Sequence, residues 1–584
     1  MNIFFTERTI PDVFFEVFEK FSKKTAFLYK KADVYFPITF QEFGEKVKIL
    51  SSALSDLGIV KGDKVAILSE NRPEWPISDL AIMSLGAITV PLHTTFNSKA
   101  IRIVLNHSRA KILIISNSDL LRKVLLEKSK IKHLEKIIFL QKPTLAEKEI
   151  LNGKIFTWET IFSHYRDRAK NFKKRYFESD DVCSIIYTSG TTGKPKGVMI
   201  THKNFLSNVE AVSSIVPVKE NDVFLSVLPL SHVLERTAGY YIPLIFGATI
   251  AYAENIKQLP YNLKEVKPTV LIAVPRIFEK FHDAIWDKIR TSKFKNKIFQ
   301  WGLKQKKNSF QYKIADYLIF KKIRNNLGGK LRLTISGGAT LNEKISRFFY
   351  KIGIMILEGY GLTETSPVVT VNREKDFKFG TVGKPIPGTK VKISPEKEIL
   401  VKGPNVTSGY FKDKKNTKQV FNKEGWFKTG DMGFLDEEGF LTVIGRIKEM
   451  IVTSGGKNVW PEKIESYLNK DRFIINSMVI GNKRKFISAL IVPDWQEVEL
   501  WAKENNIKIQ SPEKMVKRQE VLDIFQERID KKINPHFSDF EKIKKFRLLV
   551  RDFSQERDEL TPTLKLRRHI IEEHYKKEIE KMYS

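Results

Sequence analysis

The chain has 584 residues and a mass of 67.6 kDa, with 42% hydrophobic and 29% charged residues. This size and composition exclude a disordered tail and a small binding module, and they predict at least two domains. The single cysteine, Cys183, excludes an internal disulfide and a cysteine-based zinc site within one chain. The formal net charge of +32 favours anionic partners, although a compositional bias of the whole chain is an equally good explanation.

The sequence shows no export signal and no membrane-spanning stretch. Residues 1–9 mix Phe4 and Phe5 with Glu7 and Arg8, unlike the apolar core of a secretory signal. The apolar tracts at 80–92 and 240–253 are shorter than the roughly 20 residues that a spanning helix needs. We therefore expect a cytoplasmic protein, whose contact with the inner face of the cell membrane would be peripheral.

Helical periodicity alternates with short apolar runs through the first two thirds of the chain. The region 39–57 is helical in period, and strand-like runs lie at 64–68, 111–115, 182–186, 223–228, 269–274 and 331–336. This alternation predicts an α/β fold with doubly wound layers. In such folds the turns that follow the strands hold ligands.

The segment 285–331 is helical in period and strongly basic. Its lysines are interleaved with Trp286, Phe299, Trp301 and Phe310. Such a segment could lie on an acidic membrane surface. The alternative is a pair of surface helices with solvated charges.

The texture of the sequence changes after residue 390. Short strands with frequent glycines predict a β-rich subdomain at about 380–446. Beyond it, strand candidates at 475–480 and 487–492 alternate with helices at 495–503 and 519–534. We predict a large N-terminal domain at 1–446 and a small, mobile α+β domain at 447–584.

One motif has the composition of a phosphate-binding loop. It reads Tyr187-Thr-Ser-Gly-Thr-Thr-Gly-Lys-Pro-Lys-Gly197 and follows the apolar run at 182–186. Small hydroxyl residues and glycines let backbone and side-chain donors surround a polyphosphate, and lysines add countercharge. Its glycines do not have Walker A spacing. The predicted phosphate-binding residues are Thr188, Ser189, Gly190, Thr191, Thr192, Gly193, Lys194 and Lys196.

Further motifs follow in a fixed order. They are Ser336-Gly-Gly-Ala-Thr340, Glu358-Gly-Tyr-Gly-Leu-Thr-Glu-Thr-Ser366, Thr429-Gly-Asp431, Gly445-Arg-Ile-Lys-Glu449 with Ser454-Gly-Gly-Lys-Asn458, and Thr561-Pro-Thr-Leu-Lys-Leu-Arg567. Together with the loop, they resemble the signatures of the AMP-forming acyl-CoA synthetases, a branch of the adenylate-forming enzymes. The resemblance extends over nearly the whole chain.

The chemistry of these motifs suits ATP. Glu364 is a plausible oxygen ligand for Mg²⁺, which binds one or two carboxylates together with phosphate oxygens. Thr363 and Thr188 can donate to phosphates, and Tyr360 offers a flat face to adenine. The predicted nucleotide-binding set also includes Gly337, Gly338, Ala339, Glu358, Gly359 and Gly361.

The resemblance assigns roles to four residues near the C-terminal domain. It implies that Asp431 binds the ribose, that Arg446 reaches the nucleotide and that Lys448 acts as the hinge between domains. Lys565 corresponds to the catalytic lysine, whose ammonium pairs with the substrate carboxylate and the α-phosphate.

The segment Leu228-Pro-Leu-Ser-His-Val-Leu-Glu-Arg236 and the segment Val274-Pro-Arg-Ile-Phe-Glu279 resemble the long-chain branch of the family. His232 matches a family residue near the carboxylate and the path of the CoA thiol. The predicted catalytic residues are therefore Lys565, Thr188, Glu364 and His232.

The resemblance implies a ligase that uses ATP, Mg²⁺ and CoA to convert a fatty acid through acyl-AMP into acyl-CoA. The main alternative is a synthetase that hands the acyl group to an acyl carrier protein, whose acidic surface would attract a basic chain. A fatty acyl-AMP ligase is disfavoured because no insertion follows Arg446. No nucleic-acid-binding module is visible, and a homodimer is possible.

Overall fold

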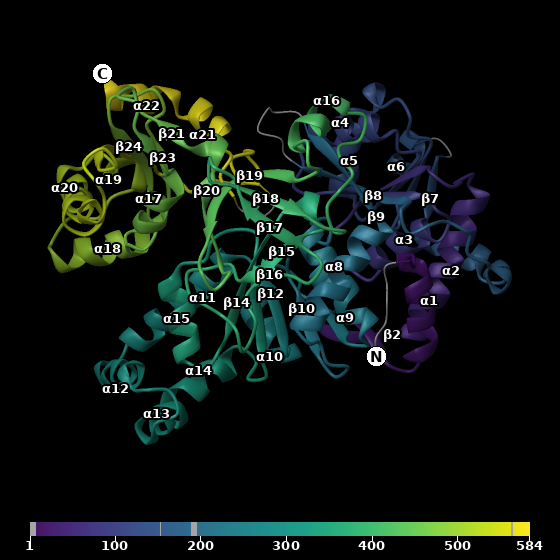
Figure 1. The fold of residues 1–584 in the computed structure, drawn as a ribbon, viewed down its shortest axis with the longest axis horizontal. Helices are drawn as coiled ribbons and strands as arrows, with labels where there is room; N and C mark the ends of the chain where they lie inside the picture. Colours follow the sequence, from purple (N-terminus) through teal and green to yellow (C-terminus); the bar gives the residue numbers. More distant parts are fainter. Residues whose placement is uncertain (1–6, 152–153, 189–194, 562–564) are drawn as a thin grey trace. The chain divides into compact units, whose positions relative to one another are not determined.

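The computed structural model describes residues 7–151, 154–188, 195–561 and 565–584 (Figure 1). The chain forms two compact units. Unit 1 comprises residues 1–392, 400–429 and 435–442, and unit 2 comprises 393–399, 430–434 and 443–584. The boundary predicted near residue 446 lies close to the start of the main segment of unit 2.

The larger sheet of unit 1 is mostly parallel in its centre. Its strands lie in the order β16-β15-β14-β13-β12-β10-β11-β1-β2. Strands β1, β11, β10, β12, β13 and β14 pair in parallel, and antiparallel pairs occur only at the two edges. The bounds are β1 Thr25–Lys31, β2 Val34–Thr39, β10 Val223–Ser226, β11 Thr249–Tyr252, β12 Val270–Ala273, β13 Leu333–Ser336, β14 Ile356–Gly361, β15 Val368–Val371 and β16 Lys384–Pro385.

A second sheet of unit 1 has the order β7-β6-β5-β3-β4-β8-β9. All its pairs are parallel except the final pair, β8 with β9. Its central strands are buried runs of Ile, Leu and Val, as expected where helices cover both faces of a sheet. The bounds are β3 Lys64–Leu68, β4 Ile88–Leu92, β5 Ile112–Ile115, β6 Lys136–Phe139, β7 Ile155–Thr157, β8 Val182–Thr188 and β9 Lys196–Thr201.

The helices of unit 1 connect these strands, and several begin with a capping box, as α2 does at Thr39 and Glu42. They are α1 Ile10–Lys20, α2 Phe40–Asp56, α3 Glu74–Met83, α4 Ser98–Ser108, α5 Ser118–Leu125, α6 Leu145–Leu151, α7 Trp158–Tyr165, α8 His202–Ile215, α9 Ile242–Ile245, α10 Leu259–Val266, α11 Pro275–Arg290, α12 Lys293–Lys304, α13 Phe310–Ala315, α14 Lys321–Asn326, α15 Glu343–Lys351 and α16 Lys414–Val420. Short 3₁₀ turns are η1 Lys128–Lys130, η2 Arg168–Asn171 and η5 Thr363–Thr365, and π-helical turns are η3 Glu235–Tyr241 and η4 Asp316–Phe320.

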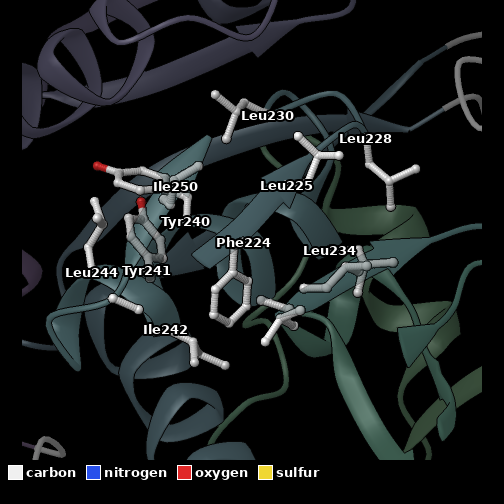
Figure 2. Packing of buried hydrophobic residues seen from close by; sticks show 14 of the residues in the cluster. Phe224, Leu225, Leu228, Leu230, Leu234, Tyr240, Tyr241, Ile242, Leu244 and Ile250 are labelled. Atoms are coloured by element: carbon white, nitrogen blue, oxygen red, sulfur yellow. The ribbon is translucent and has the colours of Figure 1, made fainter. Parts of the chain in front are cut away.

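A buried ion pair lies in the core of unit 1. The guanidinium of Arg236, on η3, donates to Asp79 of α3 and, over 2.7 Å, to Ser184 of β8. The hydroxyl of Tyr241 donates to the same carboxylate over 2.8 Å. A buried pair is tolerated only when its remaining donors and acceptors are satisfied, as they are here. Apolar side chains around η3, including Phe224 and Leu234, fill the adjoining core (Figure 2).

Strands β17 Lys390–Ile393, β18 Glu398–Lys402, β19 Phe427–Leu435 and β20 Leu441–Arg446 form a four-stranded sheet in chain order. Its residues are divided between the two units. The β-rich segment predicted from the sequence coincides with these strands.

Unit 2 contains a three-stranded sheet, β23 Ile474–Ile480, β24 Ile487–Pro493 and β25 Ile543–Leu548, and a small hairpin, β21 Ile451–Val452 with β22 Asn458–Val459. Its helices are α17 Pro461–Leu468, α18 Trp495–Glu504, α19 Pro512–Met515, α20 Gln519–Arg528, α21 Arg568–His574 and α22 Lys576–Tyr583, with shorter turns η6 Ile447–Glu449, η7 Ile529–Ile533 and η8 Asn534–His536. The helix predicted at 519–534 thus changes to a π-helical turn at Ile529.

The predicted α/β fold is confirmed. The apolar runs at 64–68, 111–115 and 331–336 become strands, and the segment 285–331 is mostly helical. In the part of the chain that the structure describes, no helix is both long enough and apolar enough to cross a membrane.

Candidate active site

Several predicted site residues of unit 1 lie at one edge of the large sheet. Strands β10, β12, β13 and β14 run parallel, so their carboxyl ends share an edge. His232 lies in the connection after β10, residues 337–339 follow β13, and Tyr360 lies at the end of β14. This is the edge at which open α/β sheets bind ligands.

Glycines bring the backbone after β13 close to its neighbours. Gly338 has a positive φ of 82°, which favours glycine. A Cβ atom added to Gly337 would lie 3.0 Å from a methyl group of Leu234, two residues beyond His232. The glycine-rich turn therefore lies against the His232 segment.

Strand β14 has one buried acid and one close backbone approach. Glu358 is buried and accepts a hydrogen bond of 2.8 Å from Ser346 of α15, and burial raises the pKa of its carboxyl to about 7. The Glu358 side chain therefore makes a hydrogen bond within the protein core, and a nucleotide contact at this residue would come from the backbone. At Gly361 a Cβ would lie 1.8 Å from the carbonyl oxygen of Pro367, so only glycine fits.

Glu364 lies on a turn that contacts from distant parts of unit 1 hold in place. Its Oε1 accepts a hydrogen bond of 2.9 Å from the hydroxyl of Tyr410, and its carbonyl oxygen accepts one of 2.8 Å from the N–H of Thr407. The carbonyl of Thr365 accepts a bond of 3.0 Å from the buried amide of Asn405. The carboxylate thus has a fixed position.

The residues around Glu364 fit a magnesium ion that is held partly by a nucleotide. Among the described residues, no group of three or more His, Cys, Asp or Glu side chains could hold a metal by itself. Mg²⁺ commonly takes one or two carboxylates together with phosphate oxygens and water. The half-buried Glu364, placed by Tyr410, is a donor of this kind.

Tyr410 also connects Glu364 to the base of the predicted phosphate loop. Lys196 begins β9 and pairs with Thr188, the last residue of β8. The ammonium of Lys196 lies 5.1 Å from the centre of the Tyr410 ring and donates to Asn416 over 3.1 Å. The loop itself, with Ser189, Gly190, Thr191, Thr192, Gly193 and Lys194, lies outside the described residues. Tyr410 was not among the predicted site residues.

His232 has a second histidine beside it. The Nδ1 atom of His232 accepts a hydrogen bond of 3.2 Å from the N–H of Leu234, so the neutral ring carries its proton on Nε2. The ring of His93 lies 6.4 Å away, centre to centre, and its Nδ1 is 2.7 Å from the hydroxyl of Ser231. Sequence reasoning missed His93, although it directly follows the buried strand β4, as ligand-binding residues often do.

Asn71 fixes the segment that precedes His232. Its amide nitrogen donates to Ser226 over 2.9 Å and to the carbonyl of Leu228 over 2.6 Å, and its oxygen accepts from the N–H of Leu230 over 2.9 Å. Asn71 follows β3, whose sheet differs from that of β10. No local pattern in the sequence indicates this contact.

Unit 2 brings together the predicted ribose, nucleotide and lysine residues. Asp431, buried on β19, lies 3.1 Å from Nε of Arg446 at the end of β20. Loss of hydration beside the surrounding protein lowers the pKa of Lys565, and the positive charge of Arg446 lowers it further. The negative charges of Glu462 and Asp431 act in the opposite direction and raise this pKa. Lys448 is exposed on η6, where a hinge residue can change conformation.

Two hydrogen bonds join Lys565 to Thr561, and we call these two residues the Lys565 segment. Its N–H donates to the hydroxyl of Thr561 over 2.9 Å, and its carbonyl accepts from the N–H of Thr561 over 2.8 Å. The residues between them, 562–564, lie outside the described part. The side chain of Lys565 is exposed.

Arg568, three residues after Lys565, connects the Lys565 segment to two acids elsewhere in unit 2. Its guanidinium makes a two-pronged pair with Glu465, at 2.8 Å and 2.5 Å, and its Nε lies 3.5 Å from Glu449. Glu449 belongs to the same motif as Arg446 and Lys448. These ion pairs of Arg568, called the Arg568 clamp, therefore connect the Lys565 segment to the motif that starts the C-terminal region.

Two family models account for most of the chain. Residues 14–411 match the AMP-binding enzyme family, and residues 448–584 match the C-terminal domain of AMP-binding enzymes. The chain belongs to the AMP-binding enzyme family, which uses ATP.

The curated relatives include long-chain ligases. A long-chain-fatty-acid–CoA ligase of Mycobacterium bovis is 33% identical over 94% of this chain and 93% of its own length. A chloroplast long-chain-fatty-acid–[acyl-carrier-protein] ligase of Arabidopsis thaliana is 29% identical over 99% of this chain and 87% of its own. Among solved structures, ATP-bound MatB from Rhodopseudomonas palustris has the same fold, with a TM-score of 0.70 and 23% identity over 97% of this chain and 99% of that one.

Proposed function

We propose that this chain is a long-chain fatty acid–CoA ligase. In the first step the fatty acid carboxylate attacks the α-phosphorus of ATP, which forms acyl-AMP and releases pyrophosphate. In the second step the CoA thiol attacks the acyl carbon, which forms the thioester and releases AMP and a proton. The observation that carries this proposal is the full-length similarity to long-chain CoA ligases, together with the ordered site motifs.

The phosphates of ATP would be bound in unit 1. Thr188 and Lys196 flank the predicted loop, and Glu364 with Thr363 lies on the turn that Tyr410 connects to Lys196. When bound, Mg²⁺ would neutralise phosphate charge, with Glu364 as its protein ligand. Tyr410 would keep the Glu364 carboxylate aimed at it.

The motif residues suit the base and the ribose of the nucleotide. Tyr360 offers its ring to the adenine, and the turn at 337–339 allows close approach of the base. Asp431 accepts from the ribose hydroxyls, since a carboxylate has several acceptor positions. Arg446, paired with Asp431, adds a positive charge for the nucleotide.

Lys565 would stabilise the first transition state by contacting the carboxylate and the α-phosphate oxygens. His232, with its proton on Nε2, can donate to the substrate carboxylate. The ring of His93 beside it would add a second polar group near the carboxylate. Between steps, unit 2 would rotate about Lys448 and withdraw Lys565 to admit the CoA thiol.

The second candidate transfers the acyl group to an acyl carrier protein, and the similarity to the Arabidopsis ligase supports it. A cytoplasmic location, peripheral membrane contact and a homodimer also remain proposals. The net charge of +32 supports acidic partners of either kind.

The test is mass spectrometry of the products formed by purified protein with Mg·ATP and acids from acetate to oleate. Parallel reactions contain CoA, acyl carrier protein or neither acceptor. Long-chain acyl-CoA formed together with AMP supports the ligase. Acyl-AMP that only the carrier protein consumes would replace it by the second candidate.

A further inference from the structure

A helical hairpin of unit 1 exposes an unusual number of large apolar side chains. It consists of α12 and of the helix that runs through α13, η4 and α14, and Figure 1 shows it standing out from the sheets of unit 1. Phe294, Phe310 and Tyr317 are 72%, 75% and 74% exposed. The exposed set also includes Trp301, Ile314 and Leu318.

Four of the exposed side chains of α12 form a stripe. Phe294, Lys297, Trp301 and Lys304 recur at intervals of three and four residues, which places them on one side of a helix. The opposite side packs inward through Phe299 and Gly302. The stripe alternates aromatic rings with lysines.

The hairpin is held together by its inner side. A Cβ atom at Gly302 would lie 2.8 Å from the Cβ of Ala315 on α13. The rings of Phe299 and Phe320 lie 5.9 Å apart, edge to face. Because these contacts form the core of the hairpin, the exposed aromatics are not needed to keep it folded.

The second arm repeats the pattern. Phe310, Ile314, Tyr317 and Lys321 follow one another at helical spacing and are all exposed. On the same arm Tyr312 and Ile319 point inward and are buried. Both arms therefore present apolar and basic side chains outward.

The charge of the hairpin is almost entirely positive. Between residues 293 and 322 there is one acid, Asp316, and its carboxylate pairs with Arg324 at 2.5 Å and 2.8 Å. In this fully described segment no lysine forms a salt bridge. The nine lysines are Lys293, Lys295, Lys297, Lys304, Lys306, Lys307, Lys313, Lys321 and Lys322.

We propose that the outer face of α12, α13 and η4 is a docking surface for an anionic lipid bilayer. The lysines would lie at the level of the lipid phosphates, where each is attracted by the negative surface potential. The aromatic and aliphatic side chains would enter the interface, as the apolar face of an interfacial helix does. This surface does not depend on the proposed ligase activity.

Charge alone would also attract a nucleic acid. The exposed aliphatic side chains favour the bilayer, because Ile314 and Leu318 gain burial in an acyl layer and nothing from a phosphate backbone. Nucleic-acid binding is therefore an outcome of the test.

The test is flotation of the full chain with vesicles of phosphatidylcholine and of phosphatidylcholine mixed with phosphatidylglycerol. The aromatic variant carries Phe294→Ser, Trp301→Ser and Phe310→Ser, and its control carries Leu126→Ser, Tyr176→Ser and Tyr261→Ser at positions that are also exposed. The charge variant carries Lys293→Gln, Lys295→Gln, Lys297→Gln and Lys304→Gln. Its control carries the same change at Lys128, Lys130, Lys132 and Lys142, which are exposed elsewhere on unit 1.

We expect the wild-type chain to prefer the mixed vesicles, and each hairpin variant to bind them at least about tenfold more weakly. Both controls should bind like the wild type. Equal binding by hairpin variants and controls would overturn the proposal. So would single-stranded RNA that binds more tightly than the mixed vesicles and loses affinity in both hairpin variants.

Insertion can be measured separately. Phe310→Trp places a reporter on the exposed face, and Tyr261→Trp is its control. Lipids with brominated acyl chains should quench the added fluorescence of the first variant and not that of the second. If neither is quenched while both bind, the side chains do not enter the bilayer and the proposed docking mode is wrong. Circular dichroism verifies that each variant is folded.

Discussion

The Glu364 turn of unit 1 and the Lys565 segment of unit 2 are held in place by different kinds of contact. Buried groups from separate segments hold the first. The amides of Asn208 and Asn405 donate to the carbonyl of Thr365, and the hydroxyl of Tyr410 donates to Glu364. The second is held by hydrogen bonds between Lys565 and Thr561, and by Arg568, three residues further on, which pairs with Glu465. The contrast is between a half-buried carboxylate held by several segments of unit 1 and an exposed lysine. The exposed position suits the proposed role of Lys565, which would act in the first step and withdraw before the second.

Loss of the Arg568 clamp should have the largest effect on the stability of unit 2 around the Lys565 segment. Arg568→Ala leaves the carboxylate of Glu465, which is 8% exposed, without its cation. Breaking such a pair costs about 3–5 kcal/mol, so unit 2 should become less stable by that amount. Urea titration with hydrogen exchange of β23 and β24 measures the loss.

The matched control is Arg518→Ala, which breaks an exposed pair with Glu520 and should cost about 1 kcal/mol or less. Equal losses in the two variants would mean that Arg568 is an ordinary surface arginine.

Removing the amine of Lys565 should separate the two half-reactions. Lys565→Ala should slow pyrophosphate release by about 100- to 1,000-fold, the usual cost of one transition-state donor. Thioester formation from supplied acyl-AMP should be largely retained. Lys576→Ala, at another exposed lysine of unit 2, should change neither rate. Equal loss of both half-reactions in Lys565→Ala contradicts the division of labour.

Glu358 should make unit 1 less stable as the pH rises. Its folded pKa of about 7 lies above the ordinary value of 4.5, so between these values the folded state holds a proton that the unfolded state has lost. Stability therefore falls from about pH 4.5 to pH 7, by about 3 kcal/mol in total. Glu358→Gln keeps an acceptor for Ser346 and removes this penalty.

The measurement is urea denaturation of the wild type and Glu358→Gln at pH 5 and pH 8, followed by hydrogen exchange of β14. The variant should gain stability relative to the wild type on going to pH 8. A pH-independent difference between the two would show that the carboxyl is ionised in the folded state.

Tyr410→Phe should have the smallest effect of the four. It removes the hydrogen bond to Glu364 and keeps the ring beside Lys196. Losing an outer partner of a metal ligand costs about 10-fold or more in metal affinity or activity. Adenylate formation should therefore require more Mg²⁺, while Tyr261→Phe, at an exposed position, should leave the Mg²⁺ dependence unchanged. An unchanged dependence in Tyr410→Phe would assign Tyr410 a purely structural role.

The sequence alone was enough to predict the α/β fold and the family. The apolar runs predicted β3, β5, β8, β10, β12 and β13, because a strand buried on both faces must be apolar along its length. The motifs, and the family that they resemble, predicted roles for Glu364, Asp431, Arg446 and Lys565, and these roles stay predictions. The basic helical segment at 285–331 was recognised by composition and period.

The tertiary structure alone decided which distant residues contact the predicted site segments. Tyr410, His93, Asn71 and Arg568 act across large separations in sequence, and a single side chain at the end of a strand has no periodicity to reveal it. Likewise, the sequence predicted that α12 is basic and aromatic, but only packing at Gly302 and Phe299 determined that Phe294 and Trp301 face outward. Sequence patterns record local geometry, whereas the choice of neighbours follows from how whole elements pack.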